Sequence, residues 1–300
     1  MRTIADRYRV TSPIGRGGMG EVWEGTDLRL NRPVAIKLIN GADLAAEKEA
    51  RRRFNREARI TARLRHPGVP VVYDFGDDGD LYMVMEALRG DSIGKLKDEA
   101  GSLPVPWAAF ICAQVCAVLA AAHEAGLLHR DVKPENLVLC RDGAVKVIDF
   151  GVAASLGAGE FSRITQTGQV PGTARYMAPE LIDGADASRA SDLYTVGCVL
   201  YELLTGDRPY QSRDLLREIA RSREEDPPPM AGVPAELEEL TRRLLAKDPA
   251  HRPSDATAVY RSLLPWISDL RPLPGWVAPD LSSDPAHMYT MVISSLGAVR

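Results

Sequence analysis

The sequence predicts an α+β protein whose first part, of about ninety residues, is rich in strands, and whose remainder is mainly helical. Short β-rich runs separated by turn residues fill the first part, around one charged, Ala-rich stretch with helical spacing. Two later stretches are apolar on nearly every face, as in helices buried inside a sizeable lobe. Five prolines between residues 265 and 285 predict an extended tail. The predicted bounds are 1–88 for the strand-rich part, 89–265 for the mainly helical part and 266–300 for the Pro-rich tail.

Several strands around one helix are expected in the first part. The β-rich runs are Tyr8–Ile14, Glu21–Gly25, Pro33–Ile39, Val69–Phe75 and Leu81–Ala87. The helix is expected over residues 44–65. In the remainder, helices are expected over two stretches that are apolar on nearly every face, Trp107–Ala125 and Leu193–Leu204, and over the amphipathic stretch Ala235–Lys247. A short strand pair is expected around the turn at residues 142–143.

The composition excludes several classes of protein. Apolar residues make up 45% and charged residues 26%, and the net charge of −4 gives no excess that would attract nucleic acid. No uninterrupted run of 18 apolar residues and no leader-like start occur, so we expect a cytoplasmic chain without a membrane span, while an anchor beyond Arg300 stays open. The four cysteines are expected to be buried thiols; Cys112, Cys116 and His123 could share a helical face, but a fourth metal ligand is missing.

A glycine-rich pattern lies between the first two expected strands. Gly15, Gly17, Gly20 and Val22 form G-x-G-x-x-G-x-V. Glycines allow backbone amides to approach phosphate oxygens closely. Dinucleotide sites use a similar pattern, but there a helix follows at once, whereas here a β-rich run follows. The pattern therefore favours a phosphate-binding loop between two strands.

Lys37 ends an apolar strand at residues 34–37. It could point to water at a sheet edge. Alternatively its ammonium group could meet the α- and β-phosphates of a nucleotide, steadied by a carboxylate, for which Glu57 on the expected helix is the candidate.

The later part carries three ordered motifs. Residues 129–136 read His-Arg-Asp-Val-Lys-Pro-Glu-Asn, residues 149–151 read Asp-Phe-Gly, and residues 178–180 read Ala-Pro-Glu. With these, the chain resembles the eukaryotic-like (Hanks-type) protein kinase family, in its bacterial serine/threonine branch, from about Tyr8 to Leu264. The resemblance implies a bilobal kinase fold, with an N-lobe antiparallel sheet, one regulatory helix and a mainly helical C-lobe.

The resemblance also implies an activity. The chain would transfer the γ-phosphate of ATP to serine or threonine hydroxyls of proteins, with Mg²⁺ as cofactor and Mn²⁺ as an alternative ion. Asp131 would accept or orient the hydroxyl proton, and Lys133 would meet the γ-phosphate. Asn136 and Asp149 would hold Mg²⁺, and Thr173 would bridge Asp131 and Lys133.

Further residues take roles by the same resemblance. The adenine pocket would be formed by Val22, Ala35, Met85, Glu86, Leu88 and Val138, with the backbone of Glu86 and Leu88 at the adenine edge. Asp192 would brace the catalytic-loop backbone, and Arg252 would pair with Glu180. Thr61, one turn after Glu57, stands where many relatives carry a larger apolar residue, which could leave that helix loosely packed.

Regulation is expected between the Asp-Phe-Gly and Ala-Pro-Glu motifs. Thr165 and Thr167 are predicted autophosphorylation sites, and Arg130 is the arginine that would meet the phosphate. Protein substrates and a transient homodimer during autophosphorylation are the expected partners of this signalling phosphoprotein.

Three other interpretations are a catalytically inactive kinase-fold scaffold, a small-molecule phosphotransferase and a pure binding module. Against the first, Lys37, Asp131, Asn136 and Asp149 are all present; against the second, residues 172–180 match the peptide-docking kind. The third would be favoured only if ATP turnover were absent.

Overall fold

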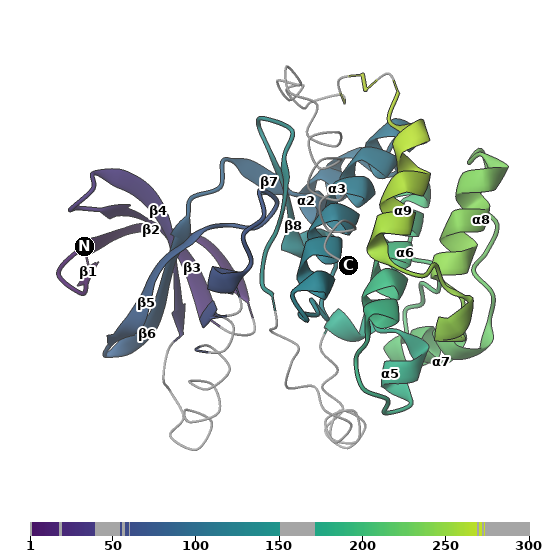
Figure 1. Cartoon of the computed structure of the whole chain (residues 1–300), viewed down its shortest axis with the longest axis horizontal. Coiled ribbons are helices and arrows are strands. Elements are labelled where there is room, and N and C mark those ends of the chain that lie inside the picture. The colour runs from purple at the N-terminus through teal and green to yellow at the C-terminus, as the bar shows by residue number, and fades with distance from the viewer. Residues whose placement is uncertain are drawn as a thin grey trace. The chain divides into compact units, whose positions relative to one another are not determined.

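The computed structural model of the chain describes residues 2–17, 20–39, 55, 58–59, 61–150, 172–268, 270–271 and 273. The chain divides into two compact units, residues 1–89 and 90–300, and each is described by itself (Figure 1). The helical N-lobe residues that are described, at 55, 58–59 and 61–63, fall inside the helix predicted over 44–65.

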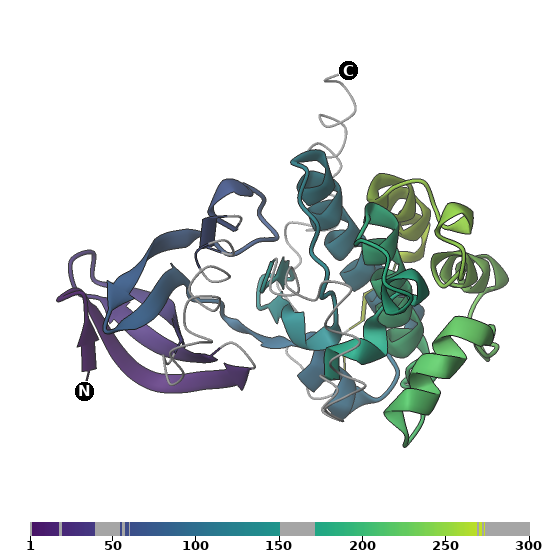
Figure 2. The same ribbon diagram turned by 90° about the horizontal axis from the view of Figure 1, so that it is seen from below.

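The first unit is built on a six-stranded antiparallel sheet, in the order β1-β2-β3-β4-β6-β5. Its strands are β1 (Arg2–Ile4), β2 (Tyr8–Gly17), β3 (Gly20–Asp27), β4 (Arg32–Ile39), β5 (Val72–Asp78) and β6 (Asp80–Glu86). The strands at the start of the chain curve strongly (Figure 2). On β4 the side chains alternate: Val34, Ile36 and Leu38 join one apolar cluster, while Ile39 packs with Ala58 in another. Both faces of the central strand are therefore covered.

Strand β1 is the one strand of this sheet that the sequence did not predict. Ile4 is buried and pairs with Tyr8, but three residues are too few to show an alternating pattern. The turn between β5 and β6 holds this edge: Arg2 Nη1 lies 2.7 Å from Asp80 Oδ2, and the Ala5 N–H donates to Asp78 at 2.7 Å. Strand β1, at one edge of the sheet, thus contacts the turn between β5 and β6 at the other edge.

The second unit is mainly helical. It contains β7 (Gly90–Ser92), α2 (Ile93–Ala100), α3 (Val105–Glu124), the short 3-10 turn η1 (Pro134–Asn136), β8 (Leu137–Cys140), β9 (Val145–Val147), η3 (Gly172–Tyr176), α5 (Pro179–Ile182), α6 (Arg189–Thr205), α7 (Leu215–Glu224), α8 (Ala235–Leu244), η4 (Pro249–His251), α9 (Ala256–Leu263) and η5 (Leu264–Trp266). Strands β7, β8 and β9 form a small antiparallel sheet. Helices α6 and α9 pack against α3, which lies at the centre (Figure 1).

Helix α3 is long and apolar enough to cross a membrane if only length and composition are considered. Most of it is buried inside the unit, however, and the core helix of a globular lobe passes the same test. The prediction of a buried helix over Trp107–Ala125 is therefore confirmed, with bounds shifted by one or two residues.

The other predicted elements of this unit are also present. Helix α6 begins earlier than predicted because Ser188 and Ser191 form a capping box, in which the Ser188 hydroxyl accepts from the Ser191 N–H at 3.2 Å. It ends at Gly206, whose φ of 87° suits glycine. Strands β8 and β9 are the pair predicted around residues 142–143.

The beginning of the predicted tail packs on the helical unit. Ile267 and Leu273 are buried, and the indole N–H of Trp107 donates to the Arg271 carbonyl at 2.8 Å. A buried indole needs such an acceptor, which a backbone carbonyl supplies. The extended conformation predicted for the rest stays a prediction, since residues 274–300 lie outside the described part.

All four cysteines are buried and free, as predicted. Burial raises the pKa values of the Cys112 and Cys116 thiols. His123 does not join them: its Nε2 lies 2.8 Å from Asp192 Oδ2. Within the described ranges no group of three or more His, Cys, Asp or Glu side chains is placed to hold a metal.

Candidate active site

Two predicted catalytic residues, Asp131 and Lys133, meet the predicted metal residue Asn136 in the loop between α3 and β8. The Asp131 carboxylate is only 6% exposed, and its Oδ2 accepts from Lys133 Nζ at 2.8 Å and from Asn136 Nδ2 at 2.9 Å. Asn136 Nδ2 also donates to the Asp131 carbonyl at 2.8 Å. The loop thus folds back on itself and fixes the orientation of the carboxylate.

Burial raises the pKa of the Asp131 carboxyl, and the Lys133 ammonium and the Asn136 amide oppose that rise. Lys133 stabilises the charged form electrostatically and through its hydrogen bond. A buried carboxylate with a cation on one oxygen is suited to take up a proton without leaving its position.

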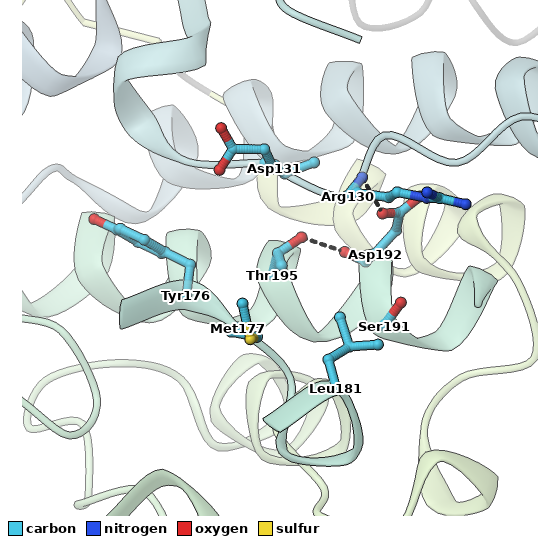
Figure 3. A pocket seen from close by; sticks show the side chains of 9 residues that line it. Arg130, Asp131, Tyr176, Met177, Leu181, Ser191, Asp192 and Thr195 are labelled. Carbon is cyan, nitrogen blue, oxygen red and sulfur yellow. Dashed lines mark hydrogen bonds between the residues drawn. The ribbon is translucent and has the colours of Figure 1, made fainter. Parts of the chain in front are cut away.

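Asp192, in the first turn of α6, braces the backbone of this loop. Its Oδ1 accepts from the Arg130 N–H at 2.8 Å, and its Oδ2 accepts from the His129 N–H at 3.0 Å and from His123 Nε2 at 2.8 Å. The bond to Arg130 is drawn in Figure 3. These bonds hold Arg130 at a φ of 71°, which is uncommon for a residue with a side chain. The bracing role expected of Asp192 agrees with this geometry, whereas the contribution of His123 was not foreseen.

The His129 ring is held in one tautomer by two hydrogen bonds. Its Nε2 lies 3.0 Å from the Ile148 carbonyl, which only accepts, and its Nδ1 accepts from the Asp131 N–H at 3.2 Å. Burial lowers the pKa of this imidazole, so the neutral form with hydrogen on Nε2 is favoured. The ring packs edge-on against Phe150 with centroids 4.6 Å apart. His129 therefore joins the catalytic loop to the strand that leads to Asp149.

Strands β8 and β9 link the two predicted metal residues. Asn136 precedes β8, and the Ile148 N–H, after β9, donates to the Asn136 carbonyl at 2.9 Å. Asp149 follows with a φ of 61°, a second left-handed residue at this site. Because the Asn136 NH₂ group is engaged by Asp131, its amide oxygen is the atom left to ligate an ion. An amide oxygen and a carboxylate are ligands of the kind that Mg²⁺ prefers, so these residues fit the implied metal.

A pocket lies beside Asp131 in the same unit (Figure 3). Its walls come from the catalytic loop, the segment before the Ala-Pro-Glu motif, α5 and the first turns of α6, and include Val132, Tyr176, Met177, Leu181, Ser191 and Thr195. Tyr176 is fixed there because its hydroxyl donates to the buried Glu202 carboxylate at 2.6 Å. Thr173 lies in η3, four residues before Met177, but its side chain is outside the described part.

The predicted pair of Glu180 and Arg252 is present. Arg252 Nη1 and Nη2 donate to the two oxygens of Glu180 at 2.6 and 2.7 Å. Arg252 also donates to the carbonyls of Ala190 at 2.9 Å and Ala246 at 2.9 Å. The buried guanidinium therefore ties the start of α5 to the first turn of α6 and to the segment after α8.

In the first unit four of the predicted phosphate and adenine residues, Val22, Ala35, Lys37 and Met85, share one face of the sheet. Val22 pairs with Lys37, and Ala35 pairs with Met85. Because residues two apart on β4 point the same way, Ala35 and Lys37 lie on one face with their cross-strand partners. Lys37 is only 4% exposed, which excludes the interpretation of a sheet-edge lysine in water.

The glycine-rich loop lies between β2 and β3, with Gly17 paired to Gly20 and Gly15 paired to Val22. Gly20 has a φ of 133°, and a Cβ there would lie 2.0 Å from the Leu38 carbonyl oxygen. Strand–loop–strand geometry, which the sequence favoured over a dinucleotide loop, is confirmed.

The remaining predicted residues are only partly described. Glu86 ends β6, and its N–H already donates to the Val71 carbonyl at 2.9 Å; Leu88 follows that strand. Val138 is half-buried on β8, in the second unit. Glu57, Thr165 and Thr167 lie outside the described residues, so their predicted roles are untested.

Comparison with known proteins adds independent information. Residues 8–264 match the family model described as the protein kinase domain. The chain is 40% identical over 291 residues to serine/threonine-protein kinase PknA of Mycobacterium tuberculosis, covering 92% of this chain and 67% of that protein. It is 41% identical to serine/threonine-protein kinase PknL of Mycobacterium bovis over 87% of this chain and 65% of that protein. It is 38% identical to a probable serine/threonine-protein kinase PknB of Corynebacterium glutamicum, covering 87% of this chain and 42% of that protein.

Proposed function

Since this chain belongs to the protein kinase family, in the branch of its bacterial serine/threonine relatives, we propose that it phosphorylates protein hydroxyls by the residues described above. The donor is the γ-phosphate of ATP, and the acceptors are serine and threonine side chains. The observation that carries the proposal is the Asp131 carboxylate, buried beside a pocket and bonded to Lys133 and Asn136.

Each residue has a defined task in this transfer. The oxygen of the substrate hydroxyl bonds to the γ-phosphorus of ATP, and ADP leaves. As this happens, the Asp131 carboxylate accepts the proton of that hydroxyl. Lys133, already bonded to Asp131, is placed to offset the negative charge of the transferred group. Lys37, buried on its sheet face, meets the phosphates of ATP, and Glu57 is its proposed carboxylate partner.

Asn136 and Asp149 are the residues proposed to hold Mg²⁺, with Mn²⁺ as an alternative. When bound, the ion offsets charge on the phosphate oxygens and orients them. The residues of the chain supply the rest: the hairpin of β8 and β9 sets the spacing of Asn136 and Asp149, and Asp192 fixes the loop that carries the base.

The test is phosphotransfer by the purified chain from γ-labelled ATP to peptides that differ only in a serine, threonine or tyrosine acceptor. Asp131→Asn is expected to lower the rate by about 10²–10⁴ while nucleotide binding is retained. Serine and threonine peptides are expected to be labelled and the tyrosine peptide not. Wild-type rates in Asp131→Asn would remove Asp131 as the base, and absent turnover in the wild type would favour the inactive scaffold.

Autophosphorylation is a further part of the proposal. Thr165 and Thr167 lie between the Asp-Phe-Gly and Ala-Pro-Glu motifs, and phosphate there would add about −1.5 to −2 charges for Arg130 to bind. Mass spectrometry after incubation with Mg·ATP should find phosphate at both positions in the wild type and none in Lys37→Met. An initial rate of autophosphorylation that rises with the square of the protein concentration would indicate the transient homodimer. Full activity of the Thr165→Ala, Thr167→Ala double variant would exclude a regulatory role.

A further inference from the structure

An amide side chain lies buried in the middle of the apolar helix α3. Gln114 has no exposed surface, and its neighbours Ala113 and Val115 are buried apolar residues. Burying an amide is unfavourable unless its hydrogen bonds are replaced. Both ends of this one are used: Nε2 donates to the Gly143 carbonyl at 3.1 Å, and Oε1 accepts from the Val145 N–H at 2.9 Å. Both of these partners are backbone groups of one segment, residues 143–145.

That segment is the closed end of the hairpin of β8 and β9. Gly143 lies in the turn, with a φ of 82°, and its N–H donates to the Cys140 carbonyl at 3.0 Å. The Cys140 N–H in turn donates to the Ala144 carbonyl at 2.8 Å, and Val145 begins β9. Gln114 thus fixes the turn and the first residue of the returning strand to the core helix.

The open end of the same hairpin carries the proposed metal residues. Asn136 comes directly before β8, and Asp149 comes two residues after β9 ends at Val147. The ladder between the strands has only three residue pairs, from Leu137–Val147 to Leu139–Val145. A ladder this short has few bonds of its own to resist a displacement of its turn, and a slip of one residue would move Asp149 relative to Asn136.

We propose that Gln114 is a positioning residue for the Mg²⁺–nucleotide site: by holding the hairpin turn, it sets the spacing of Asn136 and Asp149. The inference rests on the proposed function, because that function makes these two residues the metal ligands. Side chains that orient metal ligands from behind typically change metal affinity or activity by about 10–100-fold when they are removed. Gln114 does this from a helix that contributes no ligand itself.

The test replaces Gln114 by Met, which has a similar volume but no amide. Binding of a fluorescent ATP analogue is measured as Mg²⁺ is titrated, without any phosphotransfer. The apparent dissociation constant for Mg²⁺ is expected to rise about tenfold in Gln114→Met. Hydrogen exchange at the Val145 amide, whose acceptor is lost, is expected to accelerate. Asp149→Asn is the positive control for the Mg²⁺ constant, and Val115→Ala is the control for a core substitution in the same helix.

Gln114→Glu provides a second variant if the Met protein does not fold. It keeps an acceptor for the Val145 N–H and loses the donor to Gly143, so a smaller rise of the Mg²⁺ constant is expected, with the Val145 amide still protected. Faster Val145 exchange with an unchanged Mg²⁺ constant would overturn the inference, as would an equal shift in Val115→Ala. Wild-type protein whose nucleotide binding does not depend on Mg²⁺ would refute the proposed metal site, and with it this inference.

Discussion

At Gly20 the loop between β2 and β3 leaves no space for a side chain. The φ of 133° is strained for any residue with a Cβ, and that atom would meet the backbone carbonyl of Leu38 at 2.0 Å. Backbone cannot move aside as a flexible side chain can. Gly20→Ala is therefore expected to displace β3 from β4, beside the Val22–Lys37 pair.

Nucleotide affinity and the thermal unfolding midpoint measure this effect. Gly20→Ala should lower both, because the phosphate loop and the strand next to Lys37 shift together. Gly15→Ala is the matched control: a Cβ at Gly15 meets nothing within 4 Å, so folding stability should be retained. Equal unfolding midpoints for Gly20→Ala and the wild type would show that the sheet accommodates the methyl group.

Among single residues, motif positions could be predicted and supporting positions could not. Asp131, Lys133 and Asn136 lie five residues apart at most, so the loop that joins them is local and the motif specifies it. From α3, His123 supports this loop through Asp192, 69 residues away, and Gln114 supports the β8–β9 hairpin through Gly143, 29 residues away. One polar residue in an apolar helix has no sequence signature that names its partner, and so both were missed.

Among the elements, α6 packs closely against the end of α8 at Gly197. A Cβ at this position would lie 2.7 Å from Leu244 Cβ and 3.2 Å from Leu245 side-chain atoms. Glycine in a helix interior costs about 1 kcal/mol relative to Ala, so close packing is the reason for it here. Gly197→Val is expected to force the helices apart and to lower the free energy of unfolding by about 1–3 kcal/mol.

Denaturant unfolding of Gly197→Val measures this loss, and Gly94→Ala in α2 is the control. A Cβ at Gly94 makes ordinary contact at 3.4 Å with the Glu135 side chain, so helix propensity should make that variant neutral or more stable. A Gly197→Val protein as stable as the wild type would mean that α8 can move without cost.

Element prediction succeeded where the apolar pattern was long, as in α3 and α6, or where a turn marked the strands, as in β8 and β9, and it missed the three-residue strand β1. Helices α3 and α6 have many apolar residues, so tertiary packing and local pattern agree. Strand β1 has three residues, and its place in the sheet depends on pairing with β2 and on ties to Asp78 and Asp80. The ties to Asp78 and Asp80 come from residues more than 70 positions away, which no local pattern encodes.

At the scale of the whole molecule, buried charges join segments that are distant in sequence. Arg252 and Glu180 neutralise each other through two hydrogen bonds, so their burial carries little net charge. Lys247 differs: its Nζ donates to the Tyr210 hydroxyl and to the Ser222 carbonyl, both at 2.7 Å, and lies 4.1 Å from the centre of the Tyr210 ring. Both hydrogen-bond partners are neutral, since burial raises the pKa of Tyr210.

The Lys247 ammonium therefore makes protein stability depend on pH. Burial lowers its pKa in the folded protein to about 8, against 10.5 for the ordinary side chain. Between these values the unfolded chain binds more protons than the folded one, so this group favours folding increasingly as pH rises from about 8 towards 10.5. Below about pH 8 both states are protonated, and the unfavourable burial of charge is constant.

The free energy of unfolding of the wild type, measured from pH 7 to 10, should rise relative to that of Lys247→Met. Lys95→Met, at an exposed lysine whose pKa is raised by Asp91, should keep the rise. Parallel curves for the wild type and Lys247→Met would show that Lys247 stays protonated in the folded protein throughout this range.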